Sequence, residues 1–250
     1  MSGGRPLPST PGSGHLRTPR NLTPGNAMIW TVPNILTFSR VAAAPMVALV
    51  FALLERPIAD LVAFALFMSA SATDFMDGWL ARRWNQVTAL GKMLDPIADK
   101  AMVIIALAVL MAVAGLHWAM LAPVSLILLR EVAVSGLREF LGNEFKLPVT
   151  RLAKWKTTAQ MFAIGTLFLA GWADETLAGL MRELPPQTAG AILTGAAQDT
   201  VGLRFWHALA PAGWAAGYAL LWVAAGMTLI SGWDYMARGV AFIRAREGRG

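Results

Sequence analysis

Cysteine is absent from the chain, and histidine occurs only three times, at His15, His117 and His207. The absence of cysteine excludes disulfides and thiolate metal sites, and three scattered histidines do not suggest a metal centre. Charge is also scarce, because 14% of the 250 residues are charged whereas 56% are hydrophobic. The mean hydropathy is +0.53. Soluble domains are usually about 45–50% apolar, so this composition indicates a membrane protein.

The apolar residues gather in stretches that can cross a bilayer, which takes about 20 residues per helix. We place six spans at residues 37–55, 57–82, 93–116, 117–141, 152–173 and 211–236. Asn34 is a suitable N-cap for a helix beginning at Ile35, and Pro33 would end any regular structure before it. The predicted fold is all-α: a polytopic membrane protein with six transmembrane helices and a short N-terminal interfacial helix.

Two segments differ from this pattern. Residues 1–27 hold five glycines and five prolines, so we expect a disordered tail, and Met28 is a possible alternative start. Residues 28–250 then form one membrane domain. Residues 174–210 are too polar to span and too apolar for a plain linker, so we expect a partly helical insertion on the non-cytoplasmic membrane surface.

The basic residues predict the orientation. With six spans, sixteen of the 21 lysines and arginines fall on one side and three on the other. This bias puts both termini on the cytoplasmic face. The net charge of +6 is therefore mainly a topology signal that also favours anionic lipids, and nucleic-acid binding is not expected.

Four aspartates stand out in this hydrophobic chain. Asp74 and Asp77 are three residues apart at the end of one span, and Asp95 and Asp99 are four apart at the start of the next. Each pair shares a helix face. Single acids at span ends are often solvated caps, but four facing carboxylates would repel one another without a cation. An all-oxygen ligand set favours Mg²⁺ or Mn²⁺, and two such ions suit displacement at phosphorus.

Small residues accompany these acids. Gly78 and Ala81 continue the face of Asp74 and Asp77, which lets another group approach the backbone, and Gly91 is expected in the turn that follows. The pattern D-x-x-D-G-x-x-A-R-x(8)-G-x(3)-D-x(3)-D, from Asp74 to Asp99, resembles the signature of the CDP-alcohol phosphotransferase family.

The resemblance implies a homodimeric membrane enzyme with its site at the cytoplasmic face. It implies that the metals and the CDP group are held by the first three aspartates with Gly78, Ala81 and Arg82. It assigns Asp99 as a general base that also lies beside metal. The acceptor hydroxyl would attack the β-phosphorus of a CDP-linked lipid, and CMP would leave.

A basic cluster suggests the acceptor. It comprises Arg130, Arg138, Lys154 and Lys156. Such residues are also what the orientation bias predicts, and Glu131 or Glu139 could simply pair with them. Near a metal site, however, they resemble a phosphate receptor.

Four stretches are closer to one subfamily: "VPNILTFSR", "DGWLARRWNQVTALGKMLDPIADK", "REVAVSGLRE" and "KWKTTAQM". They resemble bacterial phosphatidylglycerophosphate synthases of the inner membrane, which join CDP-diacylglycerol to sn-glycerol 3-phosphate. That resemblance also implies that Asn34, Thr37 and Arg40 lie near the nucleotide. The alternatives are another acceptor, such as serine or inositol phosphate, an Asp-rich intramembrane prenyltransferase, and a divalent-cation transporter.

Overall fold

The computed structural model describes residues 31–84, 88–142 and 151–248. Within these ranges only the backbone is described at residues 75, 77, 78, 80–82, 92 and 151–154. The described chain is built of helices and contains no strand. The tail predicted at 1–27 lies outside the described residues.

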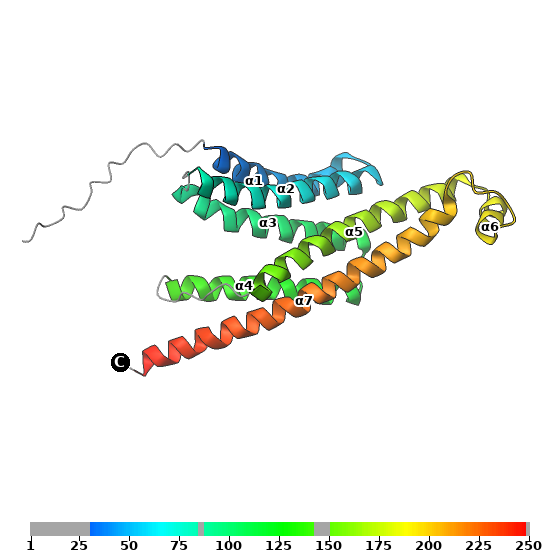
Figure 1. Cartoon of the computed structure of the whole chain (residues 1–250). Coiled ribbons are helices and arrows are strands. Elements are labelled where there is room, and N and C mark those ends of the chain that lie inside the picture. The colour runs from blue at the N-terminus through cyan, green and yellow to red at the C-terminus, as the bar shows by residue number, and fades with distance from the viewer. Residues whose placement is uncertain (1–30, 85–87, 143–150, 249–250) are drawn as a thin grey trace, which may run out of the picture.

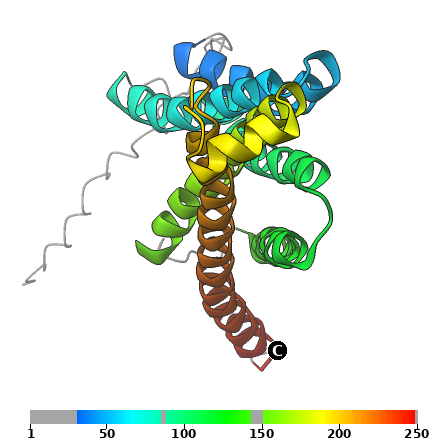
Figure 2. The same ribbon diagram turned by 90° about the vertical axis from the view of Figure 1, so that its right-hand side faces the viewer.

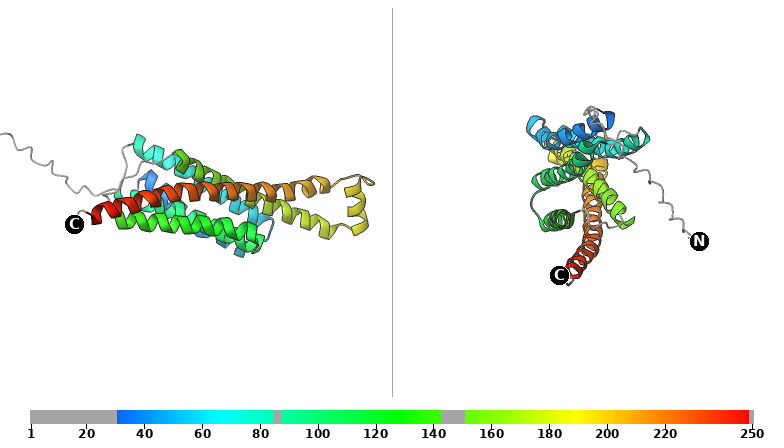
Figure 3. Two further views of the ribbon diagram at one scale, coloured as in Figure 1. Left: turned by 90° about the horizontal axis from the view of Figure 1, so that it is seen from below. Right: turned by 90° about the vertical axis from the view of Figure 1, so that its left-hand side faces the viewer.

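Seven helices make up the described chain: α1 (Val32–Leu53), α2 (Ile58–Arg83), α3 (Ala89–Ala114), α4 (Trp118–Leu141), α5 (Arg151–Glu183), α6 (Pro186–Thr194) and α7 (Leu203–Glu247). Helices α1 to α3 form one group, and α4 lies below them beside α7 (Figure 1). Helix α7 runs the length of the molecule (Figure 3) and is visibly curved (Figure 2). The ends of α2, α4 and α7 lie toward one end of the molecule, and α6 lies at the opposite end (Figure 1).

Four of these helices, α1, α3, α4 and α7, are long and apolar enough to cross a membrane. This agrees with a polytopic membrane protein. The spans expected at 57–82 and 152–173 correspond to helices α2 and α5, and their crossing of the membrane stays a prediction. A separate interfacial helix is not seen in the described part of the chain, because α1 is continuous from Val32.

The start of α1 corrects a prediction. Thr31, and not Asn34, caps the helix, because the Thr31 hydroxyl accepts a hydrogen bond from the backbone N–H of Asn34 at 3.3 Å. Pro33 lies within the first turn, where a proline costs no intrahelical hydrogen bond. The side chain of Asn34 is therefore available for a different contact.

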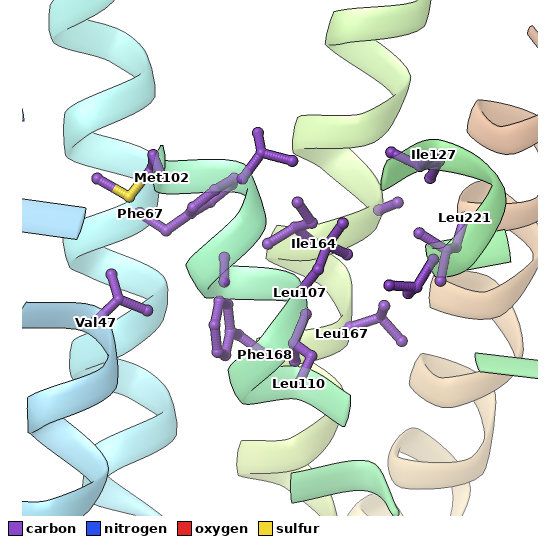
Figure 4. Packing of buried hydrophobic residues seen from close by; sticks show 14 of the residues in the cluster. Val47, Phe67, Met102, Leu107, Leu110, Ile127, Ile164, Leu167, Phe168 and Leu221 are labelled. Carbon is purple, nitrogen blue, oxygen red and sulfur yellow. The ribbon is translucent and has the colours of Figure 1, made fainter. Parts of the chain in front are cut away.

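The core lies where α5 meets its neighbours. Phe168 of α5 is fully buried, with its ring centre 6.3 Å from that of Phe51 in α1 and 6.4 Å from that of Phe67 in α2. Leu107 of α3 and Leu221 of α7 belong to the same cluster, part of which is shown in Figure 4. The packing of α5 against α7 is the most extensive in the molecule.

Residues 174–210 are more regular than expected. Helix α5 continues to Glu183 and α7 begins at Leu203, with α6 between them. The guanidinium of Arg204 donates to the carbonyls of Ile192 and Ala197, at 2.6 and 3.0 Å. The Asp199 carboxylate accepts from the N–H groups of Arg204 and Leu203, which lowers the pKa of Asp199. The segment thus consists of the end of α5, the short helix α6, a hydrogen-bonded turn and the start of α7.

Candidate functional site

Helix α1 holds the acids of α2 and α3 together. The guanidinium of Arg40, only 4% exposed, forms an ion pair with Asp74 of α2 and lies 3.4 Å from Oδ1 of Asp95 in α3. The hydroxyl of Thr37 donates to the same Asp95 oxygen at 2.9 Å. Thr37 and Arg40 therefore lie among the predicted site residues, one helical turn apart on the buried face of α1.

Asn34 fixes where α3 begins. The hydroxyl of Thr88 donates to the side-chain oxygen of Asn34 at 2.8 Å and accepts from the N–H of Gly91 at 3.0 Å, so Thr88 is the N-cap of α3. The sequence predicts Gly91 in the turn before this helix. In the structure, Gly91 lies instead in the first turn of α3. A Cβ at Gly91 would stand 2.9 Å from the Asn34 oxygen. The hydrogen bonds among Asn34, Thr88 and Gly91 therefore hold the first turn of α3, and Asp95 follows one turn further along.

The carboxylates on α2 and α3 supply the oxygen donors that a hard divalent cation requires. Arg40, Asp74 and Asp99 line one small cavity, and the guanidinium of Arg40 shows that positive charge is accommodated between Asp74 and Asp95. Among residues with described side chains, no group of three acids or histidines is arranged to hold a metal. The side chain of Asp77 lies outside that description, as do those of Gly78, Ala81 and Arg82, so the four-aspartate metal centre stays a prediction.

A larger pocket of about 340 Å³ lies beside this cavity. Its walls come from α3, α4, α5 and α7, and Asp99 lines both the pocket and the smaller cavity. Three of the four predicted basic residues line it, namely Arg130, Arg138 and Lys156. The side chain of the fourth, Lys154, is outside the description. Asp99 is therefore placed between Asp74 and Asp95, which together with it are here called the acid cluster, and the larger pocket, here called the basic pocket.

Glu131 pairs with two of these cations. Its Oε1 accepts from Nη1 of Arg130 at 3.0 Å and forms an ion pair with Nζ of Lys156. Pairing with Glu131, one of the alternatives to phosphate binding, is thus present for both residues. Lys156 is buried and Arg130 is 14% exposed, so neither is an ordinary solvated residue at a helix end.

Helix α7 supplies residues that the sequence did not suggest. The guanidinium of Arg138 lies over the ring of Tyr235, 5.9 Å from its centre, and Arg238 pairs with Asp234 at 2.9 Å. Lys100, directly after Asp99, also lines the pocket. Its adjacency to the acid motif was a usable signal, but nothing in the sequence indicated that the end of α7 returns to this site.

The pocket lining has an excess of positive charge. Its cations are Lys100, Arg130, Arg138, Lys156 and Arg238, and its acids are Asp99, Glu131 and Asp234. With all of them ionised, the lining carries a net charge of +2, from five cations and three acids. This charge complements a phosphate monoester, which is close to a dianion at neutral pH.

Comparison with known proteins decides the family. A model of CDP-alcohol phosphatidyltransferases matches residues 30–228 of the chain. The chain belongs to this family. Its matched region includes α1 to α6 and the first half of α7, and therefore both the acid cluster and most of the basic pocket.

Similar curated proteins share one name, CDP-diacylglycerol–glycerol-3-phosphate 3-phosphatidyltransferase. The protein of that name from Cereibacter sphaeroides is 49% identical over 220 residues, which is 87% of this chain and 99% of the relative. The one from Rickettsia bellii is 37% identical over 205 residues, 82% of this chain and 92% of the relative. The one from Pectobacterium atrosepticum is 41% identical over 153 residues, 60% of this chain and 81% of the relative.

Proposed function

We propose that this protein transfers the phosphatidyl group of CDP-diacylglycerol to sn-glycerol 3-phosphate, giving phosphatidylglycerol phosphate and CMP. The observation that carries the proposal is the placement of Asp99 between the acid cluster and a pocket with net positive charge. The names of the relatives support the same donor and acceptor. Membership of the family argues against a prenyltransferase or a cation transporter.

The donor half of the reaction belongs to the acid cluster. Asp74, Asp77, Asp95 and Asp99 would hold one or two Mg²⁺ or Mn²⁺ ions, which would neutralise the pyrophosphate of the donor. Arg40 and Thr37 orient Asp74 and Asp95 from α1. We assign the cytidine end to Gly78, Ala81 and Arg82, on the strength of the family signature.

The acceptor half belongs to the basic pocket. Arg130, Arg138, Lys154 and Lys156 would bind the phosphate of glycerol 3-phosphate, which leaves its free primary hydroxyl toward Asp99. The Asp99 carboxylate takes the proton of that hydroxyl, and the oxygen forms a bond to the β-phosphorus. The bond from this phosphorus to the bridging oxygen breaks, and CMP leaves with that oxygen.

The membrane arrangement is a further part of the proposal. Helices α1, α2, α3, α4, α5 and α7 would be the six spans of a protein in the bacterial inner membrane. The site and both termini would face the cytoplasm, and residues 174–210 would lie on the other side. A homodimer is expected from the family resemblance.

An acceptor panel tests the proposal. Purified protein in liposomes that contain CDP-diacylglycerol should release CMP on addition of glycerol 3-phosphate and Mg²⁺, and chelation of the metal should stop the release. Serine and inositol phosphate serve as competing acceptors. Release of CMP with either of these, and none with glycerol 3-phosphate, would assign the protein to the same chemistry with a different acceptor.

A further inference from the structure

Arg130 occupies an unusual position in the basic pocket. Its side chain leaves α4 and lies against the backbone of α7, where Nη2 donates to the Ser231 hydroxyl at 3.3 Å. Nη1 donates to Glu131 at 3.0 Å. Nε is buried and finds no acceptor among the described residues. A buried donor without a partner is costly, which indicates that the position of this side chain is imposed by its surroundings.

The room for Arg130 is provided by Gly232. A Cβ at this buried glycine would stand 2.6 Å from Cγ of Arg130 and 3.2 Å from its Nε. Cγ is close to the backbone of α4, so a small movement at the tip of the side chain could not relieve the clash. Any other residue at position 232 would force Arg130 into a different rotamer.

We propose that Ser231 and Gly232, here called the α7 seat, are positioning residues that hold Arg130 for the phosphate of the acceptor. The α7 seat thereby sets the preference for phosphorylated over neutral alcohols. This inference rests on the proposed function, and it adds to the basic cluster two residues that carry no charge. Ser231 lines the pocket, and Gly232 follows it in α7 and packs against Arg130, which lines the pocket as well.

The chemistry of guanidinium binding explains why position matters. Arginine binds a phosphate best through two parallel N–H donors, and that arrangement requires a fixed plane. Glu131 engages Nη1 and Ser231 engages Nη2, so the guanidinium plane is set before an acceptor arrives. A guanidinium that must be reoriented loses this preorganisation, and the loss falls on substrates that carry a phosphate.

Gly232→Ala tests the inference, with Gly226→Ala as its matched control. Gly226 lies in the same helix, and a Cβ there would meet nothing within 4 Å. We expect Gly232→Ala to raise the KM for glycerol 3-phosphate by about tenfold, comparable with the loss of one charge-assisted hydrogen bond. The KM for CDP-diacylglycerol should not change, and neither should the rate measured with unphosphorylated glycerol as acceptor, whatever its size in the wild type. Gly226→Ala should match the wild type.

A double-mutant cycle separates positioning from general damage to the fold. In an Arg130→Ala background the clash partner is gone, so adding Gly232→Ala should have no further effect on the KM for glycerol 3-phosphate. Additive losses, or equal losses for both substrates, would overturn the inference. Should Gly232→Ala not yield folded protein, Ser231→Ala carries the test. It should raise the acceptor KM about threefold through loss of a neutral hydrogen-bond partner, and an unchanged KM would overturn the inference.

These outcomes are distinct from failure of the proposed function. In that case the wild-type protein itself would release no CMP with glycerol 3-phosphate. Failure of the inference alone leaves the wild-type reaction intact, with Gly232→Ala and Gly226→Ala indistinguishable.

Discussion

At the scale of single residues, Asp99 lies where the two parts of the site meet, because it lines both the smaller cavity beside Arg40 and the basic pocket. We expect Asp99→Asn to keep binding CDP-diacylglycerol and to lose at least about 10²–10⁴ in turnover, the usual worth of general-base assistance. Stopped-flow or discontinuous measurement of CMP release checks this. Asp174→Asn, an exposed acid on α5 outside the pocket, is the control. Near-normal turnover of Asp99→Asn would remove Asp99 from the base role.

Arg138 tests the acceptor pocket at the same scale. Its guanidinium lies over Tyr235 and, unlike Arg130 and Lys156, forms no ion pair with the side chains that the structure describes. We expect Arg138→Ala to raise the KM for glycerol 3-phosphate roughly ten- to hundredfold, the cost of a lost charge-assisted contact, with little change for CDP-diacylglycerol. Initial rates with each substrate varied in turn make the comparison. An equal change in both Michaelis constants would indicate a structural role.

At the scale of elements, the start of α3 is set by Thr88. Thr88→Ala removes the N-cap and the hydrogen bond to Asn34, so we expect a loss of about 1 kcal/mol in the free energy of unfolding. Activity should fall as well, because Asp95 follows in the next turn. Ser69→Ala, which removes an exposed hydroxyl from α2, is the control. Thermal unfolding of the two variants in detergent makes the comparison. Equal unfolding temperatures would show that the Thr88 cap does not contribute to stability.

An ion-pair network joins α2 to α5 at the other end of α2. Asp60 is 1% exposed and is held by Arg56 at 2.7 Å, while a second Arg56 nitrogen donates to the carbonyl of Gly171 at 3.1 Å. Arg56→Ala leaves a buried acid without its cation, and we expect it to cost about 3–5 kcal/mol of stability. Arg182→Ala removes an exposed partner of Glu175 and should cost about 0–1 kcal/mol. Equal unfolding temperatures for these two variants would contradict the assigned role of the network.

At the scale of the whole molecule, α7 joins regions that the sequence treats as separate. Its 45 residues measure about 67 Å at 1.5 Å per residue, over twice a bilayer core of about 30 Å. The helix therefore extends beyond any single span, from the turn after α6, past the α7 seat and Arg238, to Glu247. Its C-terminal half thus carries part of the basic pocket, and its first residues follow the 174–210 segment.

The orientation can be tested because the chain contains no cysteine. Thr188→Cys on α6 and Ala245→Cys near the end of α7 are both exposed positions. In intact spheroplasts, a membrane-impermeant maleimide should label Thr188→Cys, whereas Ala245→Cys should react only after lysis. The reverse pattern would place the site on the opposite face of the membrane.

How much the sequence predicts depends on the distance over which the signal acts. The pattern from Asp74 to Asp99, with its four aspartates and its fixed small and basic residues, is local in sequence, and this pattern indicates the family. The Asn34 contact with Thr88 joins residues 54 positions apart, so the sequence alone does not show that the Asn34 side chain contacts α3 instead of capping α1. The α7 wall of the pocket depends on how α4, α5 and α7 pack together, which no periodicity in α7 indicates.

In the proposed reaction, the acceptor hydroxyl attacks the β-phosphorus of the CDP-lipid from the basic pocket. The most direct test uses glycerol 3-phosphate labelled with ¹⁸O at its primary hydroxyl, with mass spectrometry of both products. We expect the label in the phosphodiester of phosphatidylglycerol phosphate, and we expect CMP to be unlabelled. Unlabelled lipid product, or phosphatidic acid together with a labelled cytidylyl ester, would contradict the proposed reaction.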